Sequence, residues 1–148
     1  MLLPAALLAL VVLACVMLHY EGLSLLDRLV RVERRFLRHV RPRILLVVVG
    51  VLMLHVVEIW LFAGSYRVLE GFSDTQLLML EDSISVGGWF HYVYFSSVVY
   101  TTVGFGEIVP VGVPLRLLAA SESLLGLVLI AWSASFTYLQ MQRLWGRS

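Results

Sequence analysis

Three long apolar stretches constrain this chain of 148 residues more than any other feature. They run from Leu2 to about Tyr20, from Ile44 to about Tyr66 and from Leu115 to about Met141. A helix of about 20 apolar residues spans the hydrocarbon core of a bilayer. Only 14% of the residues are charged, against about 25% in soluble domains. The pattern predicts an all-α membrane protein with three transmembrane helices. It argues against a soluble enzyme, a disordered tail and a nucleic-acid-binding protein.

The arginines indicate how the chain is oriented in the membrane. All 11 basic residues are arginine, and the stretch between the first two apolar segments holds seven of them: Arg28, Arg31, Arg34, Arg35, Arg38, Arg41 and Arg43. Cytoplasmic loops carry such an excess of positive charge. Segment 64–88 carries four acidic residues against one arginine, so we expect it outside. Arg143 and Arg147 favour a cytoplasmic C-terminus, which leaves the N-terminus external.

The first apolar stretch differs from a cleaved signal peptide. A signal peptide begins with a positively charged region, whereas no Lys or Arg precedes Arg28. We therefore expect residues 1–20 to stay in the protein as a transmembrane helix.

The arginine-rich segment 21–43 has the spacing of an amphipathic helix. Apolar residues recur three and four positions apart and predict one helical face: Leu25, Leu29, Val32, Phe36 and Val40. Four arginines lie on another face, where we expect them to bind anionic lipid head groups on the cytoplasmic side: Arg28, Arg31, Arg35 and Arg38. Pro42 is expected to separate this helix from the second span.

A voltage-sensing helix is the alternative interpretation of the same segment. Arg28, Arg31 and Arg34 are spaced by three, as a voltage sensor requires. Such a helix lies within the membrane among acidic partners on neighbouring helices. The segment is polar and only one span precedes it, so the surface helix is favoured.

Residues 89–107 contain a short aromatic segment and a glycine-containing motif. Trp89–Tyr100 is apolar but too short to cross a bilayer, and Thr101-Thr102-Val103-Gly104-Phe105-Gly106-Glu107 follows it. With flanking spans on both sides, this arrangement resembles the pore domain of potassium channels, whose filter is a Thr-Val-Gly-Tyr/Phe-Gly run. The resemblance covers about residues 44–141. It is closest to small prokaryotic potassium channels with one pore loop per chain.

The resemblance implies an architecture and a function. It divides residues 44–148 into an outer helix (44–66), an outer loop (67–88), a pore helix (89–101), a filter (102–106) and an inner helix (115–141). Potassium ions would be held by the backbone carbonyls of Thr102, Val103, Gly104 and Phe105, with Gly106 completing the filter. A ring of carbonyls needs four chains, so we expect a homotetramer. It would conduct K⁺ passively across a prokaryotic plasma membrane, with no other cofactor and no nucleic-acid partner.

Three positions depart from the family pattern. Phe105 replaces the commoner tyrosine, Glu107 replaces the usual aspartate, and Val98 stands where some relatives carry a glutamate behind the filter. The outer brace of the filter is therefore expected to be partly missing. Thr101 remains as a further candidate for filter support.

Two carboxyls fall inside the predicted spans. Glu58 and Glu122 lie at about the same depth, counting about 1.5 Å per helical residue. Charged groups in a membrane are costly and often functional. We interpret both as braces for the pore helix and the filter, with hydroxyl donors from the pore segment: Ser96, Ser97, Tyr100 and Thr101. Simple capping of a backbone group is the alternative for each carboxyl, and a His55–Glu58 pair could also sense pH.

The third span carries the candidate gate. Gly126 lies twenty residues after Gly106, which matches the hinge glycine of the family. Ile130, Ala134 and Tyr138 continue at a spacing of four and are candidates for cavity lining and a hydrophobic constriction. Ordinary helix packing is the alternative. Cys15, His19 and His39 are interpreted as packing or interfacial residues, and segment 75–81 as a short outer helix of unassigned role.

Other function classes stay open at this point. The chain could be a non-conducting scaffold or regulatory subunit with a degenerate filter, or a subunit of a potassium-uptake transporter. No enzyme site is recognisable in the sequence, since it shows no phosphate-binding loop, no nucleophile paired with histidine and no metal cluster.

Overall fold

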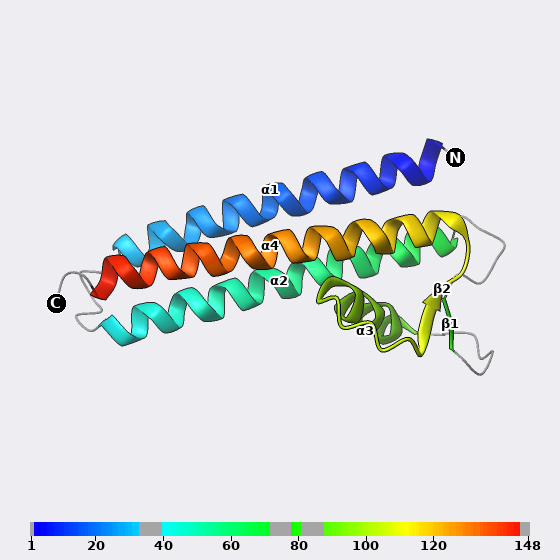
Figure 1. The fold of residues 1–148 in the computed structure, drawn as a ribbon. Helices are drawn as coiled ribbons and strands as arrows, with labels where there is room; N and C mark the ends of the chain where they lie inside the picture. The colour runs from blue at the N-terminus through cyan, green and yellow to red at the C-terminus, as the bar shows by residue number, and fades with distance from the viewer. Residues whose placement is uncertain (1, 33–39, 72–77, 81–87, 146–148) are drawn as a thin grey trace. The chain divides into compact units, whose positions relative to one another are not determined.

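The computed structural model describes residues 2–32, 40–71, 78–80 and 88–145. The elements, in chain order, are α1 (Leu2–Val32), α2 (Val40–Gly71), β1 (Leu78–Leu80), α3 (Trp89–Tyr100), β2 (Ile108–Pro110) and α4 (Val113–Trp145) (Figure 1). Three of the helices are long and apolar enough to cross a membrane, over Pro4–Arg31, Arg41–Gly71 and Val113–Trp145. The predicted all-α membrane class is confirmed.

Each long helix begins with a proline in its first turn. Pro4, Pro42 and Pro114 occupy these positions in α1, α2 and α4. The first backbone N–H groups of a helix have no partner within the helix, so a proline costs nothing there. The expectation that Pro42 separates the second span from the segment before it is therefore wrong, because α2 already begins at Val40.

The first helix does not end near Tyr20. α1 continues without a break to Val32, so residues 21–32 extend the first span instead of beginning a separate helix. No proline or glycine pair interrupts this stretch, and a helix propagates easily once formed. Arg35 and Arg38, two of the four predicted lipid-binding arginines, lie outside the described residues. Arg28 and Arg31 are exposed near the end of α1.

The buried face of α1 differs from the face that the sequence pattern predicted. Leu25 and Leu29 are 56% and 39% exposed. The buried side chains instead recur every three or four residues along the helix: Val11, Cys15, His19, Leu23, Leu26 and Val30. In a membrane an exposed leucine faces lipid at no cost, so the apolar pattern alone could not select the packed face. The interpretation of Cys15 and His19 as packed residues agrees with their complete burial.

The described chain forms two compact units. The first contains Met1–Cys15 and Glu58–Leu127, and the second contains Val16–Val57 and Val128–Ser148. Glycines allow close helix packing in the second unit. A Cβ at Gly50 would lie 2.3 Å from Leu26 Cδ2, and a Cβ at Gly22 would lie 2.8 Å from Leu54 Cδ1. Small residues of this kind let membrane helices approach each other closely.

Asp27 joins α1 to α4 within the second unit. Its Oδ1 accepts a hydrogen bond from Gln140 Nε2 at 2.7 Å and lies 3.5 Å from Arg143 Nη1. Its Oδ2 accepts a 2.9 Å bond from Nε of Arg31, one turn further along α1. Arg31 and Arg143 therefore have a protein partner in addition to any lipid contact.

The first unit contains a short two-stranded sheet. β1 pairs antiparallel with β2 in the register Leu78↔Pro110, Met79↔Val109 and Leu80↔Ile108. The prediction of a short helix over 75–81 is wrong at Leu78–Leu80, where the backbone pairs with Ile108–Pro110. The rest of that predicted helix lies outside the described residues.

Candidate functional site

The site is built around α3, a helix too short to cross the bilayer. Its 12 residues rise about 18 Å, against a hydrocarbon core of about 30 Å. Gly88 precedes it with a φ of 131° and supplies no side-chain cap. Its last turn is reinforced by its own hydroxyls, since Ser97 Oγ donates to Val93 O at 2.7 Å and Thr101 Oγ1 donates to Ser97 O at 2.7 Å.

The backbone N–H groups that follow α3 turn back toward its end. Thr102 N donates to Val99 O at 3.0 Å, while Val103 N and Gly104 N both donate to Val98 O, at 3.1 and 3.4 Å. In a trans peptide the N–H and the preceding C=O point in opposite directions, and the described residues contain no cis peptide bond. The carbonyl groups of Thr101, Thr102 and Val103 therefore point away from α3.

The backbone conformation alternates along residues 102–106. Thr102, Gly104 and Gly106 have positive φ angles of 60°, 61° and 91°, whereas Val103 and Phe105 do not. Glycine adopts positive φ readily, but a β-branched threonine does so only under strain. Thr102 is the one non-glycine residue with positive φ in the described part of the chain. Strain of this kind concentrates at functional sites.

Val98 supports this segment through its backbone instead of its side chain. Its carbonyl accepts both of the N–H groups that follow Thr102. The absence of a glutamate at this position is therefore offset in part by a main-chain contact.

Glu122 of α4 is buried and binds two elements of the first unit. Its Oε1 accepts a hydrogen bond from Ser96 Oγ on α3 at 2.5 Å, and its Oε2 accepts one from Tyr66 OH on α2 at 2.5 Å. Ser96 Oγ also lies 2.8 Å from Ile59 O. Tyr66 and Phe95 pack edge to face, with ring centroids 5.0 Å apart. The carboxyl of α4 thus connects the middle of α3 to α2 and α4.

Glu58 of α2 binds the end of α3. Its Oε2 accepts a hydrogen bond from Tyr100 OH at 2.5 Å, and both side chains are buried. Tyr100 directly precedes Thr101 and the strained segment. Of the four donors considered from the sequence, Ser96 and Tyr100 reach the carboxyls, whereas the hydroxyls of Ser97 and Thr101 bond to the backbone of α3.

A third carboxyl, that of Glu107, directly follows residues 102–106. Tyr94 OH of α3 donates a hydrogen bond to Glu107 Oε1. This bond raises the pKa of Tyr94 above its ordinary value. The two residues lie on either side of residues 102–106, so the bond joins the segment before the motif to the residue after it. The sequence predicted that side-chain support of residues 102–106 would be partly missing. The structure shows one such contact, the hydrogen bond between Tyr94 and Glu107.

Gly126 of α4 packs directly against the end of α3. A Cβ at this position would lie 2.2 Å from the carbonyl oxygen of Tyr100. Close approach of two backbones is therefore a reason for glycine here, whatever its part in a hinge. The other three gate candidates, Ile130, Ala134 and Tyr138, are exposed in the single chain.

The sequence model of a known protein family matches the part of the chain that contains this site. The profile is described as "Ion channel", and it matches residues 44–142. The chain belongs to this ion channel family. The match includes α3, the motif and nearly all of α2 and α4, and it leaves the whole of α1 outside. No curated protein and no solved structure matches the chain.

In this ion channel the segment 102–106 is exposed in the single chain. All five of its residues are exposed, and Val103 and Phe105 are 54% and 69% exposed. Non-helical backbone at membrane depth is stable only where protein buries it or where it lines a polar pathway. Oligomeric assembly, which the channel family suggests, would satisfy this requirement.

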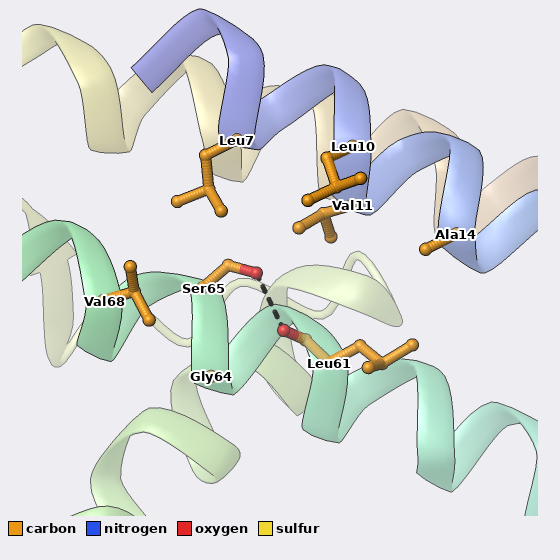
Figure 2. Close-up of a pocket in the computed structure, with 8 residues that line it drawn as sticks. All are labelled: Leu7, Leu10, Val11, Ala14, Leu61, Gly64, Ser65 and Val68. Atoms are coloured by element: carbon orange, nitrogen blue, oxygen red, sulfur yellow. Dashed lines mark hydrogen bonds between the residues drawn. The ribbon is translucent and has the colours of Figure 1, made fainter. Parts of the chain in front are cut away.

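The first unit of the channel also contains an apolar hollow of about 280 Å³ between α1 and α2 (Figure 2). Its lining consists of Leu7, Leu10, Val11, Ala14, Leu61, Gly64, Ser65 and Val68. The only side-chain hydroxyl in this lining, that of Ser65, donates to Leu61 O at 2.8 Å. The hollow therefore presents no unused polar side chain among its lining residues.

The sequence analysis did not predict several contacts of the site. Tyr66 and Tyr94 were not singled out, although each donates to one of the predicted carboxyls. In the sequence, a tyrosine within an apolar helix cannot be distinguished from an aromatic residue that only packs. Its hydroxyl partner comes from an element distant in the chain, so no local pattern could have identified it.

Proposed function

We propose that this ion channel is selective for potassium and conducts it passively through a homotetrameric pore. The observation that carries the proposal is the orientation of the carbonyls that follow α3. The carbonyls of Thr101, Thr102 and Val103 point away from the pore helix, and the last two belong to the Thr-Val-Gly-Phe-Gly motif. Such oxygens can replace the hydration shell of K⁺. The ligands would be the carbonyls of Thr102, Val103, Gly104 and Phe105, with Gly106 completing the filter.

A tetramer follows from the geometry of one chain. Each chain contributes one strand of carbonyls, and an ion on the axis needs a ring of them. The negative C-terminal end of α3 from each chain would favour a cation on the same axis. In this assembly the exposed residues Ile130, Ala134 and Tyr138 would line the cavity below the filter and form its inner constriction.

The charge pattern supports the orientation of the channel. We place the N-terminus and the filter outside and the C-terminus in the cytoplasm of a prokaryotic cell, because seven arginines lie within residues 28–43, around the junction of α1 and α2, and two more lie at 143 and 147. Arg28 and Arg31 would then reach anionic head groups at the inner surface.

Flux through liposomes tests the function. The purified chain should pass K⁺ down a gradient, pass far less Na⁺, and be blocked by Ba²⁺. Equal fluxes of Na⁺ and K⁺ would contradict selectivity. No flux in any condition would favour the scaffold, and flux only with a second subunit would favour the transporter. Cross-linking of the liposome-bound protein should give a tetramer.

The bond between Tyr94 and Glu107 should affect how long the filter conducts. Tyr94→Phe removes the hydroxyl and keeps the ring, so we expect K⁺ current to decline several-fold faster after activation, with an unchanged tetramer. Tyr20→Phe, an exposed position on α1, is the matched control and should decline as the unmodified protein does. Identical decay in all three proteins would show that the bond does not hold the filter.

A further inference from the structure

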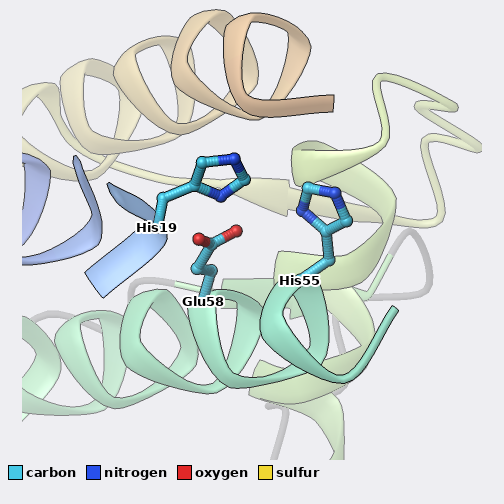
Figure 3. A group of neighbouring side chains, drawn as sticks. All are labelled: His19, His55 and Glu58. Atoms are coloured by element: carbon cyan, nitrogen blue, oxygen red, sulfur yellow. The ribbon is translucent and has the colours of Figure 1, made fainter. Parts of the chain in front are cut away.

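An apolar hollow lies between α1 and α2 within the first unit, whereas side chains of the same two helices touch within the second. In the second unit His19 of α1 and His55 of α2 have ring centroids 5.5 Å apart (Figure 3). Glycines also bring the two helices together there. In the first unit, residues within 7–14 of α1 and 61–68 of α2 surround the hollow of about 280 Å³. Their own side chains leave this space unfilled.

The lining of the hollow favours hydrocarbon over water. Its one polar side chain is that of Ser65, whose hydroxyl already donates to Leu61 O at 2.8 Å. An apolar cavity of about 150 Å³ stays dry and takes up a hydrocarbon such as benzene. This hollow is larger, and both helices around it are long and apolar enough to cross a membrane. Lipid acyl chains are the hydrocarbon available at that depth.

The hollow extends along the two helices. In Figure 2, α1 passes from Leu7 to Ala14 in the direction in which α2 passes back from Val68 to Leu61. The lining residues of each helix thus cover about two turns, or about 10 Å. A long apolar groove of this kind fits a stretch of one acyl chain.

A cationic side chain lies beside one end of the hollow. Arg67 directly precedes the lining residue Val68 and is exposed. Gly71, the last residue of α2, lies two helical turns after the lining residue Gly64 and on the same face. A Cβ at Gly71 would lie 4.0 Å from Arg67 Nη1, so the guanidinium reaches along this face toward the end of the helix. Arginines near the ends of membrane helices place their charge at the head groups in this way.

The charges around this end of the hollow suit a phosphate. Arg67 is the one Arg or Lys between residues 44 and 115, and no acidic residue precedes Glu21. Among the described residues, Arg67 forms no hydrogen bond or ion pair, not even with Glu70 three positions later. Its guanidinium is therefore available to bind phosphate oxygens through two parallel N–H groups.

We propose that the hollow and Arg67 together bind one phospholipid molecule. One acyl chain lies in the hollow, and the phosphate is bound by Arg67 at the C-terminal end of α2. The site is separate from the head-group contacts of Arg28 and Arg31, which lie near the other end of α1. Within the first unit the lipid fills the space between α2 and α1, the helix outside the family match.

Lipid binding to the purified full-length protein tests the site. Delipidated protein in detergent is titrated with dioleoylphosphatidylglycerol, and bound lipids are counted by native mass spectrometry. One molecule per chain should bind more tightly than those that follow it. Diolein has the same acyl chains without the phosphate and should bind at least about tenfold more weakly. Inorganic phosphate has no acyl chain and should not displace the lipid.

Two positions address the two parts of the site. Ala14→Phe fills the hollow from an exposed position on α1 and should weaken binding of the first lipid by at least about tenfold. Arg67→Gln removes the cation and should weaken it by about three- to tenfold. Arg67→Lys should keep most of the affinity, because an ammonium still binds phosphate as a point charge.

Matched controls carry the same changes outside the site. Ala9→Phe adds the ring at an exposed position of α1 that does not line the hollow, and Arg41→Gln removes an exposed arginine near the start of α2. Both should bind the first lipid as the unmodified protein does. A phosphatidylglycerol with a photoactivatable diazirine in its acyl chain should cross-link to residues 7–14 and 61–68 in both controls, and not in Ala14→Phe. Circular dichroism and gel filtration identify variants that fail to fold.

Clear results would overturn the site. Folded Ala14→Phe could bind the first lipid with unchanged affinity, diolein could bind as tightly as phosphatidylglycerol, or cross-links could spread evenly over all lipid-facing helices. If Ala14→Phe changed the number of chains per assembly and left lipid binding unchanged, a second copy of the chain would be the occupant. None of these readouts depends on potassium conduction, so failure of the lipid site leaves the proposed function standing, and the reverse holds as well.

Discussion

Gly126→Ala adds only one methyl group, yet we expect it to destabilise the channel strongly. The added Cβ would lie 2.2 Å from the carbonyl oxygen of Tyr100, so α4 or the end of α3 must shift. Overpacking of a tight interface costs about 1–3 kcal/mol. For a chain of this size that lowers the melting temperature by about 3–10 °C. Tyr100 lies two residues before the proposed filter, so we also expect K⁺ flux to fall if that proposal holds.

Gly64→Ala is the matched control for this prediction. It places the same methyl group on α2, where the Cβ would lie 3.9 Å from Trp89 Cη2, an ordinary contact. We expect its melting temperature and its flux to stay close to those of the unmodified protein. If Gly126→Ala altered only the opening of the pore and left the melting temperature unchanged, its role as a hinge would outweigh close packing.

The backbone conformation of residues 102–106 was predictable because its determinants are local. The positive φ angles fall at Thr102, Gly104 and Gly106, within five consecutive residues of the motif. The N–H groups that orient the carbonyls bond to residues only three to six positions earlier. The three spans were predictable for a similar reason, since their length and apolar composition are properties of single segments.

The contacts between segments were only partly predictable. Depth along the helices indicated that Glu58 and Glu122 would reach the pore helix, because a span fixes height in the membrane. Depth does not fix rotation about the helix axis. The packed face of α1 was therefore predicted wrongly at Leu25 and Leu29, and the meeting of His19 with His55, 36 residues apart, was not foreseen.

Loss of the Glu122 carboxyl should have the other large effect on the channel. Glu122→Ala leaves the hydroxyl of Tyr66 without its carboxyl acceptor in a buried position, and it opens a cavity beside Ser96. An unpaired buried polar group costs about 1–3 kcal/mol, and the cavity adds to that cost. We expect the melting temperature of the channel to fall by about 5–15 °C and, in the proposed potassium channel, the current to inactivate faster.

Glu122→Gln separates the hydrogen bonds from the charge. The amide keeps the size of the side chain, and its oxygen can still accept from Tyr66 while its nitrogen donates to Ser96 Oγ. Ser96 can then donate to Ile59 O, which lies 2.8 Å away. We therefore expect this variant to keep most of the stability that Glu122→Ala loses. Glu21→Ala, which removes an exposed carboxyl from α1, should change neither measurement. If Glu122→Gln were as damaging as Glu122→Ala, the negative charge would be the essential property, and a brace built from hydrogen bonds would be the wrong explanation.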